Sequence, residues 1–249
     1  MKIVEFVGAP GVGKSTIVNH LLASKKSGYK LWHQRMMPYV FHFPGFSSEI
    51  LRGASSSKLL HRFSNRIFTE FSHRCAPNIS VGGKAGISDA YILYSELLLP
   101  LMGKDKFPES ALAAQQRMRW FLYSYSQFGY ALTNSRDGYA LFDEGLAQRA
   151  TSLAMQGVDG EGVKRYLHST PLPDFLFHVG ADDQIVKDRL VGREGENSRL
   201  LEGISQAKNA VEMCVSVYEE RGCQVYRLNS LNSTSYNVKR ALRCLQAGL

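Results

Sequence analysis

A run of glycines that ends in a lysine and a serine stands near the start of the sequence and could bind phosphate. The residues are Gly8, Ala9, Pro10, Gly11, Val12, Gly13, Lys14, Ser15 and Thr16. Glycines let the backbone curl so that successive N–H groups point at a phosphate, an approach that side chains would obstruct. Lys14 would neutralise the β- and γ-phosphates, and Ser15 would ligate Mg²⁺. We therefore predict that these residues bind ATP, or another nucleoside triphosphate, together with Mg²⁺.

The residues on either side of this run predict the strand and the helix that a phosphate loop needs. Residues 2–7 form a mostly apolar run typical of a buried parallel strand. From Ser15 to about Ser24, aliphatic residues recur at the spacing of a helix face. This helix would direct the positive end of its dipole at the phosphates. Strand, glycine loop and helix in this order are the context that defines a P-loop.

Two acidic residues follow a second apolar run and are candidates for the chemistry of transfer. Residues 138–142 predict a strand, and Asp143 and Glu144 stand directly after it. At such sites a carboxylate beside the P-loop holds the Mg²⁺ shell or takes a proton from the attacking hydroxyl. We predict catalytic roles for both residues, with Asp143 joining Ser15 as a metal ligand, and leave open which is the base. The alternative is a strand-end acid that caps the next helix.

A cluster of arginines follows another predicted strand, at residues 173–179. The three are Arg189, Arg193 and Arg199. Phosphoryl transfer spreads negative charge over the γ-phosphoryl oxygens, and arginines on a closing loop stabilise that charge while excluding water. We predict that they are catalytic residues of a lid at about residues 189–203. The alternative is a solvated turn in which Glu194 and Glu196 pair with the arginines.

The hydrophobic patterns of the whole chain predict that strands alternate with helices. Strands are expected at 2–7, 138–142, 173–179 and 224–228, and helices at 15–24, 58–75, 87–102, 111–132, 147–155, 182–189, 205–220 and 236–245. Such alternation is typical of the α/β class, with a parallel sheet flanked by helices on both faces. With 249 residues, 44% of them hydrophobic, the chain can bury a full core. We expect one domain over residues 1–249.

Basic residues are concentrated in one segment of the chain. Residues 25–84 contain ten Lys or Arg and two acids, which accounts for the whole net charge of +8. A basic segment beside a phosphate site attracts polyanions, so a nucleotide or a nucleic acid partner is favoured. The alternative is a solvated surface with no partner. Because the signals for regular structure are poor here, we expect a basic helical or irregular insertion at about residues 28–86.

The composition also argues against several classes of protein. No apolar run approaches the roughly 18 to 20 residues of a membrane span, and the first predicted strand begins too early for a signal peptide. We therefore expect a cytoplasmic protein with no membrane partner. The four cysteines and seven histidines lack the spacing of a disulfide framework or a metal site. We expect reduced thiols and no metal other than nucleotide-bound Mg²⁺.

Taken together, these motifs resemble those of the P-loop nucleoside and nucleotide kinase superfamily, with thymidylate-kinase-like members nearest. The resemblance rests on Gly8–Thr16, the strand that ends at Asp143, and the stretch from Pro173 through Arg193. It spans roughly residues 1–24 and 138–249. It implies a P-loop NTPase fold of the nucleoside-monophosphate-kinase type, a mobile lid with arginines, and a final strand and helix that close the fold.

The sequence departs from that family at the expected acceptor site. Thymidylate kinases usually carry Asp-Arg at the end of the strand where this chain has Asp143, Glu144 and Gly145. Their substrate-binding arginine has no clear match, and Arg117 and Arg119, on a predicted helix, are the candidates. The resemblance therefore implies a kinase without identifying its acceptor.

Three hypotheses for function follow. The leading one is an ATP-dependent kinase that transfers the γ-phosphoryl group to a nucleoside, a nucleotide or a related hydroxyl acceptor, mainly through positioning and charge neutralisation. A variant is a phage-type DNA kinase that phosphorylates a hydroxymethylated pyrimidine, 5-hydroxymethyluridine, in DNA bound by segment 25–84. The third is an acceptor-independent ATPase in which Asp143-Glu144 form a Walker B motif, although no ABC signature, AAA lid or guanine-reading motif accompanies it.

Overall fold

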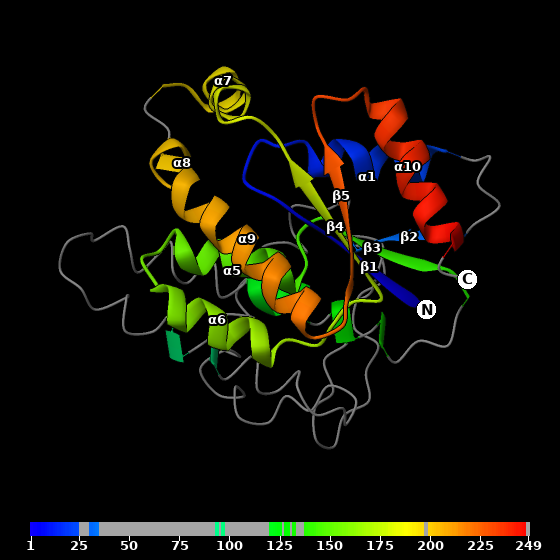
Figure 1. The fold of residues 1–249 in the computed structure, drawn as a ribbon, viewed down its shortest axis with the longest axis horizontal. Coiled ribbons are helices and arrows are strands. Elements are labelled where there is room, and N and C mark those ends of the chain that lie inside the picture. The colour runs from blue at the N-terminus through cyan, green and yellow to red at the C-terminus, as the bar shows by residue number, and fades with distance from the viewer. Residues whose placement is uncertain are drawn as a thin grey trace, which may run out of the picture.

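The computed structural model contains a parallel sheet built around the strand that precedes the P-loop. It describes residues 1–24, 30–34, 93–94, 96–97, 120–125, 127–129, 131–132, 137–196 and 199–247. Within these residues the strands are β1 (Lys2–Val7), β2 (Leu31–His33), β3 (Tyr139–Phe142), β4 (Phe175–Gly180) and β5 (Gln224–Asn229). Neighbouring strands pair in parallel, in the order β2-β3-β1-β4-β5 (Figure 1).

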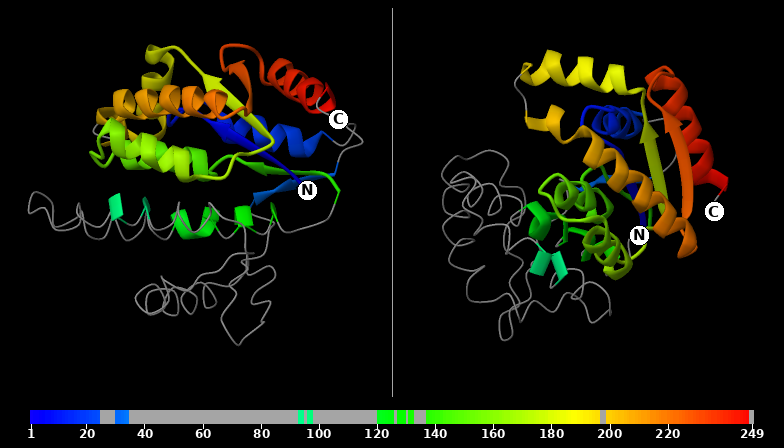
Figure 2. Two further views of the ribbon diagram at one scale, coloured as in Figure 1. Left: turned by 60° about the horizontal axis from the view of Figure 1, so that its bottom comes forward. Right: turned by 60° about the vertical axis from the view of Figure 1, so that its left-hand side comes forward.

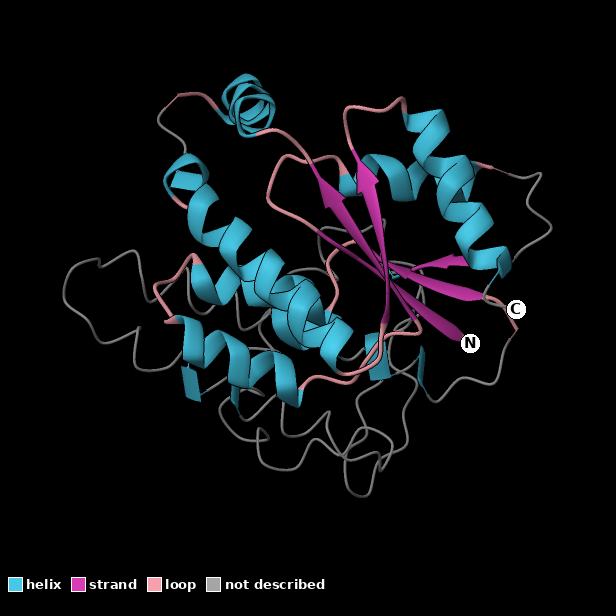
Figure 3. Cartoon of the chain, viewed as in Figure 1, coloured by secondary structure: helices cyan, strands magenta, loops and turns pink. Residues whose placement is uncertain are grey.

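Helices cover both faces of this sheet (Figure 2, Figure 3). Their bounds are α1 (Lys14–Ala23), α5 (Leu146–Ala154), α6 (Gly160–Ser169), α7 (Asp183–Glu194), α8 (Arg199–Glu202), α9 (Ile204–Glu220) and α10 (Thr234–Ala247). Helices α1 and α10 contribute to the core on one face, and α5, α6 and most of α9 contribute to the core on the other. The predicted α/β architecture, a parallel sheet flanked by helices on both faces as in P-loop NTPases, is therefore confirmed.

Strand β1 lies between these two cores, and its side chains alternate between them. Val4 and Phe6 belong to the core with α1, whereas Ile3 and Val7 belong to the core with α5. Because successive side chains of a strand point to opposite faces, a strand that is covered on both sides is normally apolar throughout. Glu5 breaks this rule, since it is only 1% exposed on the face of Ile3 and Val7.

The order of the strands brings two loops together at one edge of the sheet. From β1 the chain passes through α1 to β2, whereas from β3 it passes through α5 and α6 to β4, on the other side of β1. In open α/β sheets, ligands bind at the carboxyl ends of the strands where the direction of winding reverses in this way. Phe142, the last residue of β3, pairs with Glu5, two residues before the end of β1, so both strands end at the same edge of the sheet. The loops that follow these two strands therefore meet.

The predicted elements agree with the structure except where their ends depend on packing. The four predicted strands correspond to β1, β3, β4 and β5. Asp182, where the sequence predicts a helix to begin, caps α7, and its carboxylate accepts a hydrogen bond from the backbone N–H of Gln184 at 3.2 Å. Helix α7 continues to Glu194 rather than ending near Arg189, because Leu190 extends its buried face beyond that point. The sequence stretch predicted as an arginine-rich loop therefore begins inside a helix.

Three of the described elements were absent from the sequence prediction: α6, β2 and α8, the four-residue helix inside the predicted lid. Helix α6 begins with two glycines, which disfavour a helix, but the carboxylate of Asp159 accepts a hydrogen bond from the backbone of Gly162 at 2.7 Å and caps it. Strand β2 lies inside the segment 28–86, where we predicted a helical or irregular insertion. It is too short for a periodic pattern to be recognised. Most of that segment lies outside the described residues.

The described parts of the two predicted middle helices are helical, at 93–94 and 96–97 and from 120 to 132 with its gaps. The predicted helix at 58–75, and Arg117 and Arg119, lie outside the described residues. Of the cysteines, Cys214, Cys223 and Cys244 are free thiols, as predicted. Among the helices that the structure describes, none combines the length and the hydropathy that crossing a membrane requires.

The cap of α6 provides a test of the fold. In Asp159→Ala the N–H of Gly162 loses its acceptor, and we expect the free energy of unfolding to fall by about 1 kcal/mol. Asp159→Asn keeps an acceptor oxygen, so its free energy of unfolding should fall by only a small part of that amount. Urea denaturation of the two variants measures both changes, and equal losses would contradict the capping role.

Candidate active site

The P-loop turns between β1 and α1 through two glycines with left-handed backbones. Gly11 has a φ of 83° and Gly13 a φ of 97°. Residues with a Cβ pay about 1–2 kcal/mol to adopt this region. Gly13 is also the residue before α1, so the first free N–H groups of the helix face the loop. The glycines predicted from the sequence are therefore required by the backbone.

Lys14 is buried at the first turn of α1 and folds back over the loop. Its Nζ donates to the carbonyl oxygen of Gly8 at 2.8 Å and approaches that of Ala9 at 3.3 Å. Burial lowers the pKa of Lys14, and the nearby carboxylates of Glu144 and Asp143 partly offset this effect. A bound phosphate would add negative charge here and stabilise the ammonium form.

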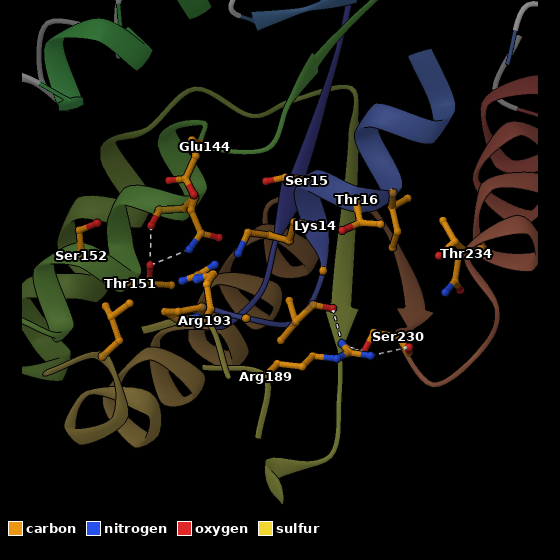
Figure 4. A pocket seen from close by; sticks show the side chains of 18 of the residues that line it. Lys14, Ser15, Thr16, Glu144, Thr151, Ser152, Arg189, Arg193, Ser230 and Thr234 are labelled. Carbon is orange, nitrogen blue, oxygen red and sulfur yellow. Dashed lines mark hydrogen bonds between the residues drawn. The ribbon is translucent and has the colours of Figure 1, made fainter. Parts of the chain in front are cut away.

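A pocket of about 800 Å³ opens beside the P-loop (Figure 4). Besides Pro10 to Ile17, the residues that line it are Trp120, Glu144, Gln148, Thr151, Ser152, Met155, Arg189, Arg193, Leu200, Ser230, Asn232, Thr234 and Asn237. They come from the helical segment at 120–125, from the end of β3 through α5, from α7 and α8, from the loop after β5, and from the first turn of α10. Of the residues predicted from the sequence, the P-loop, Glu144, Arg189 and Arg193 are thus brought together in one cavity.

Asp143 lies next to this pocket but does not line it. Its side chain is 1% exposed, and its Oδ1 lies 3.4 Å from Nε2 of His33 at the end of β2. The contact joins the ends of two neighbouring strands. The structure therefore separates the two acids that the sequence could not distinguish, because only Glu144 turns toward the cavity.

Glu144 is held firmly although its side chain is 44% exposed. Its Oε2 lies 2.8 Å from Nη2 of Arg149 on α5, and the same Nη2 donates to its backbone oxygen at 3.0 Å. Ser124 also donates to that oxygen, at 2.6 Å, and the backbone N–H of Glu144 donates to Oε1 of Gln34 at 3.3 Å. Contacts from three parts of the chain therefore fix both the backbone and the carboxylate of Glu144.

Helix α5 also contacts the P-loop directly. Oε1 of Gln148 accepts a hydrogen bond from the backbone N–H of Gly8 at 3.2 Å, and its Nε2 donates to Oγ1 of Thr151 at 2.8 Å. The amide of Gln148 is therefore oriented by one partner while it holds the first glycine of the loop. Movements of α5 would be transmitted to the phosphate-binding backbone.

The two described lid arginines differ in their contacts. Nη1 of Arg189 lies 3.4 Å from the backbone oxygen of Val12 and 3.1 Å from Oγ of Ser230, so this residue joins the P-loop to the loop before α10. Arg193 is 57% exposed and pairs with its neighbour Glu194, with an N–O distance of 2.6 Å. The alternative drawn from the sequence, a surface pair with Glu194, thus applies to Arg193, which nevertheless lines the pocket.

The predicted lid at 189–203 is largely helical in the structure. Its first part belongs to α7, and Arg199 is the first residue of α8. The side chain of Arg199 lies outside the described residues. Closure of this segment over a substrate stays a prediction.

Sequence reasoning missed the residues that hold Glu144 and the P-loop in place. Arg149 and Gln148 stand in a predicted helix, where polar side chains are normally solvated, yet both are buried. A signal was present, since Arg149 follows the acidic pair closely and has no acidic partner within its own helix. Gln34 and Ser124 gave no such signal, because their contacts depend on segments far apart in the sequence.

No family model and no curated protein sequence matches this chain. Similar solved structures include those of deoxyadenosine kinase from M. mycoides. The one with bound dATP is 13% identical, with 98% of this chain and 99% of that chain covered and a TM-score of 0.48. The one with bound dCTP is 14% identical, with the same coverage and a TM-score of 0.44. Because likeness at this level carries no argument about activity, we base the function on the residues of this chain.

The pocket can supply ligands for a nucleotide-bound Mg²⁺ ion. Among the described residues, no three His, Cys, Asp or Glu side chains gather closely enough to hold a metal by themselves. Mg²⁺ in such sites keeps several waters and takes one or two protein ligands besides the phosphates. The hydroxyl of Ser15 and the carboxylate of Glu144 both line the pocket and are ligands of this kind. The donors present therefore suit Mg²⁺ bound together with a nucleotide.

The left-handed backbone of Gly13 provides a test of the phosphate loop. In Gly13→Ala the Cβ disfavours the native φ by about 1–2 kcal/mol, which corresponds to a loss of about tenfold in affinity for nucleotide. Titration with a fluorescent ATP analogue measures this loss. Gly192→Ala on α7 is the matched control, because a Cβ there meets no atom within 4 Å. Unchanged affinity in Gly13→Ala would contradict a P-loop at this position.

Proposed function

We propose that the protein is an ATP-dependent kinase that transfers the γ-phosphoryl group to a hydroxyl or phosphate of a nucleoside, a nucleotide or a related small molecule. One observation carries the proposal. A carboxylate, that of Glu144, is held by Arg149 in the wall of the same pocket whose other wall is the P-loop with Lys14. Phosphoryl transfer needs this combination of a phosphate cradle and a fixed group that orients the nucleophile.

The donor nucleotide would bind along the P-loop. The backbone N–H groups from Gly11 onward and the ammonium of Lys14 would hold its phosphates. The pocket extends from the P-loop to Ser230 and Asn232, in the loop before α10, which supports binding of the rest of the nucleotide there. Arg189 spans these two regions and would follow the phosphate chain between them.

Mg²⁺ would be held by Ser15 together with the phosphate oxygens, and either acid after β3 would complete its shell. When bound, the ion supplies positive charge that neutralises the charge developing on the transferred group. Asp143 remains a candidate ligand, as the sequence predicts, but its burial against His33 favours Glu144 for contacts inside the pocket.

Glu144 would act as the base on the acceptor side. Its exposed carboxylate would accept the proton of the attacking hydroxyl, while Arg149 holds it in one orientation. Arg193 lines the pocket and can exchange its surface partner Glu194 for the negative charge of the transferred phosphoryl group. For Arg189, Arg193 and Arg199, the lid role inferred from the sequence remains part of the proposal.

The same geometry supports a second candidate, an acceptor-independent ATPase. Glu144 beside a P-loop can polarise water as well as an acceptor hydroxyl. Transfer of labelled phosphate from γ-labelled ATP with Mg²⁺ separates the candidates. The panel of acceptors contains nucleosides, nucleoside monophosphates, and normal and 5-hydroxymethyluridine DNA.

We expect label on a nucleoside or nucleotide, and a loss of about 100-fold or more in Lys14→Ala because the developing charge loses its cation. Label on DNA would indicate that the acceptor is a polynucleotide rather than a small molecule. Free phosphate alone, at a rate that no acceptor changes, would contradict the kinase and favour the ATPase.

Substitutions at Glu144 and Arg149 test the role of the base. Glu144→Gln removes the proton acceptor and should lower kcat by about 100-fold or more. Arg149→Lys keeps the charge, but its shorter side chain lacks the planar guanidinium that places Nη2 between the carboxylate and the backbone oxygen of Glu144, so kcat should fall by about tenfold. The ATP affinity of both variants should stay near that of the wild type in the fluorescent titration. A loss of ATP affinity equal to the loss in kcat would argue against a role in transfer.

A further inference from the structure

Glu5 is an acid at the centre of an otherwise apolar strand. It lies on β1 three residues before the P-loop begins, on the face that α5 and α9 cover. Its side chain is 1% exposed. Burying a carboxylate costs free energy unless hydrogen bonds compensate, so its contacts indicate what the residue does there.

The carboxylate of Glu5 caps a helix from outside that helix. Its Oε1 accepts from the backbone N–H of Leu146 at 2.6 Å, and its Oε2 accepts from that of Ala147 at 3.1 Å. These are the first two residues of α5, whose N–H groups have no partner within the helix. Gly145, at the cap position, has no side chain that could do this. A Cβ on Gly145 would overlap the carboxylate of Glu5.

The end of α5 that Glu5 holds is the end that carries the site. Glu144 lies two residues before the helix, Gln148 contacts Gly8 of the P-loop, and Arg149 pairs with Glu144. Strand β1 leads from Glu5 directly into the same P-loop. The two hydrogen bonds therefore join the strand that positions the phosphates to the helix that positions the candidate base.

We propose that Glu5 is a positioning residue of the phosphoryl-transfer site, acting through the N-terminus of α5. Glu5 does not line the pocket. Its ionised carboxylate accepts two hydrogen bonds and meets the positive end of the helix dipole, and both effects fix the helix relative to the P-loop. This inference rests on the proposed function, because the site that Glu5 positions is the one assigned there.

The surroundings of Glu5 make this contact sensitive to pH. Burial raises its pKa to about 7, while the N–H groups of Ala147 and Leu146 and the guanidinium of Arg149 favour the ionised form. The other titratable groups that interact with it are Tyr166 on α6, Cys214 and Tyr218 on α9, and Cys223 before β5. Burial raises the pKa of each of these, so they stay neutral near pH 7. Among the described groups named here, Glu5 is therefore the one whose charge changes near pH 7.

Ionisation of Glu5 improves the positioning of α5 but lowers the stability of the fold. The pKa of Glu5 rises on folding, from 4.5 to about 7, so its contribution to stability is lost as the pH rises through about 7. The ionised form that holds α5 best is thus the form that costs stability. If Glu5 contributed only to stability, an uncharged side chain at this position would give a more stable fold near pH 7.

Glu5→Gln and Gly145→Ala test the proposal in two ways. Glu5→Gln removes the charge, and Gly145→Ala displaces the carboxylate by steric overlap at a backbone that alanine can adopt. The matched controls are Glu161→Gln, an exposed acid on α6, and Gly192→Ala on α7. For each protein, kcat, ATP affinity and melting temperature are measured from about pH 5.5 to about pH 8.5, which brackets the pKa of Glu5.

We expect the kcat of the wild type to rise through about pH 7. In both variants kcat at about pH 8 should fall by about tenfold, with ATP affinity little changed, because a misplaced catalytic group costs this much or more. In Glu5→Gln the rise in kcat near pH 7 should disappear. Its melting temperature should no longer fall, relative to the Glu161→Gln control, as the pH increases toward 7. Full kcat and an unchanged pH profile in Glu5→Gln would overturn the proposal.

Hydrogen–deuterium exchange separates this proposal from the proposed function. The peptide that covers residues 144–150 should exchange about tenfold faster in Glu5→Gln, whereas α10 should not change. The glutamine amide has a single acceptor oxygen and no charge, so at least one of the two N–H groups of Leu146 and Ala147 loses its acceptor. If the wild type transfers no phosphate but exchange in 144–150 is faster in Glu5→Gln, the proposed function is wrong and the role of Glu5 in holding α5 is supported. If exchange in 144–150 is unchanged in Glu5→Gln, Glu5 does not hold α5, whatever the activity. Should Glu5→Gln not fold, Gly145→Ala gives the same readouts.

Discussion

The parallel pairing of β1 with β3 holds two loops at the same height on the sheet. Lys2 pairs with Tyr139 and Glu5 with Phe142, so Asp143 and Glu144 follow β3 beside the last two residues of β1, immediately before the P-loop. Neither loop could form the site alone, because one carries the phosphate-binding backbone and the other carries the carboxylates. A register shifted by one residue would turn the side chains of β3 to the opposite core. The pocket therefore depends on the hydrophobic pattern of two short strands.

Around these loops, charged side chains fix one another's orientation. Lys14 is buried and compensated by Glu144 and Asp143, Glu144 is oriented by Arg149, and Asp143 is packed against His33. Polar side chains enclosed in this way hold their geometry only while their partners remain. Between the P-loop and Glu144, the proposed site is thus held in one arrangement. Arg193, with a surface partner, is the more adaptable contact.

The sequence predicted the elements whose signals are local. The P-loop, four strands and most helices follow from glycine spacing and hydrophobic periodicity, and both Glu144 and the arginines at 189 and 193 were located at the pocket from their positions after strands. What could not be predicted depends on distant partners. Asp143 and Glu144 are adjacent, and only the contact with His33, from another strand, distinguishes them. Arg149, Gln148 and Glu5 acquire their roles through contacts across the sheet.

Glu5 and Gly145 occupy one volume between them, since any Cβ at 145 meets the carboxylate of residue 5. During evolution, substitutions at positions 5 and 145 are therefore expected to occur together. A larger residue at 145 becomes acceptable only with a shorter one at 5, and such a residue at 145 would then have to cap α5 from within its own helix, as Ser, Thr, Asp and Asn commonly do. Homologues should fall into two groups, glutamate with glycine or a small apolar residue with a capping one.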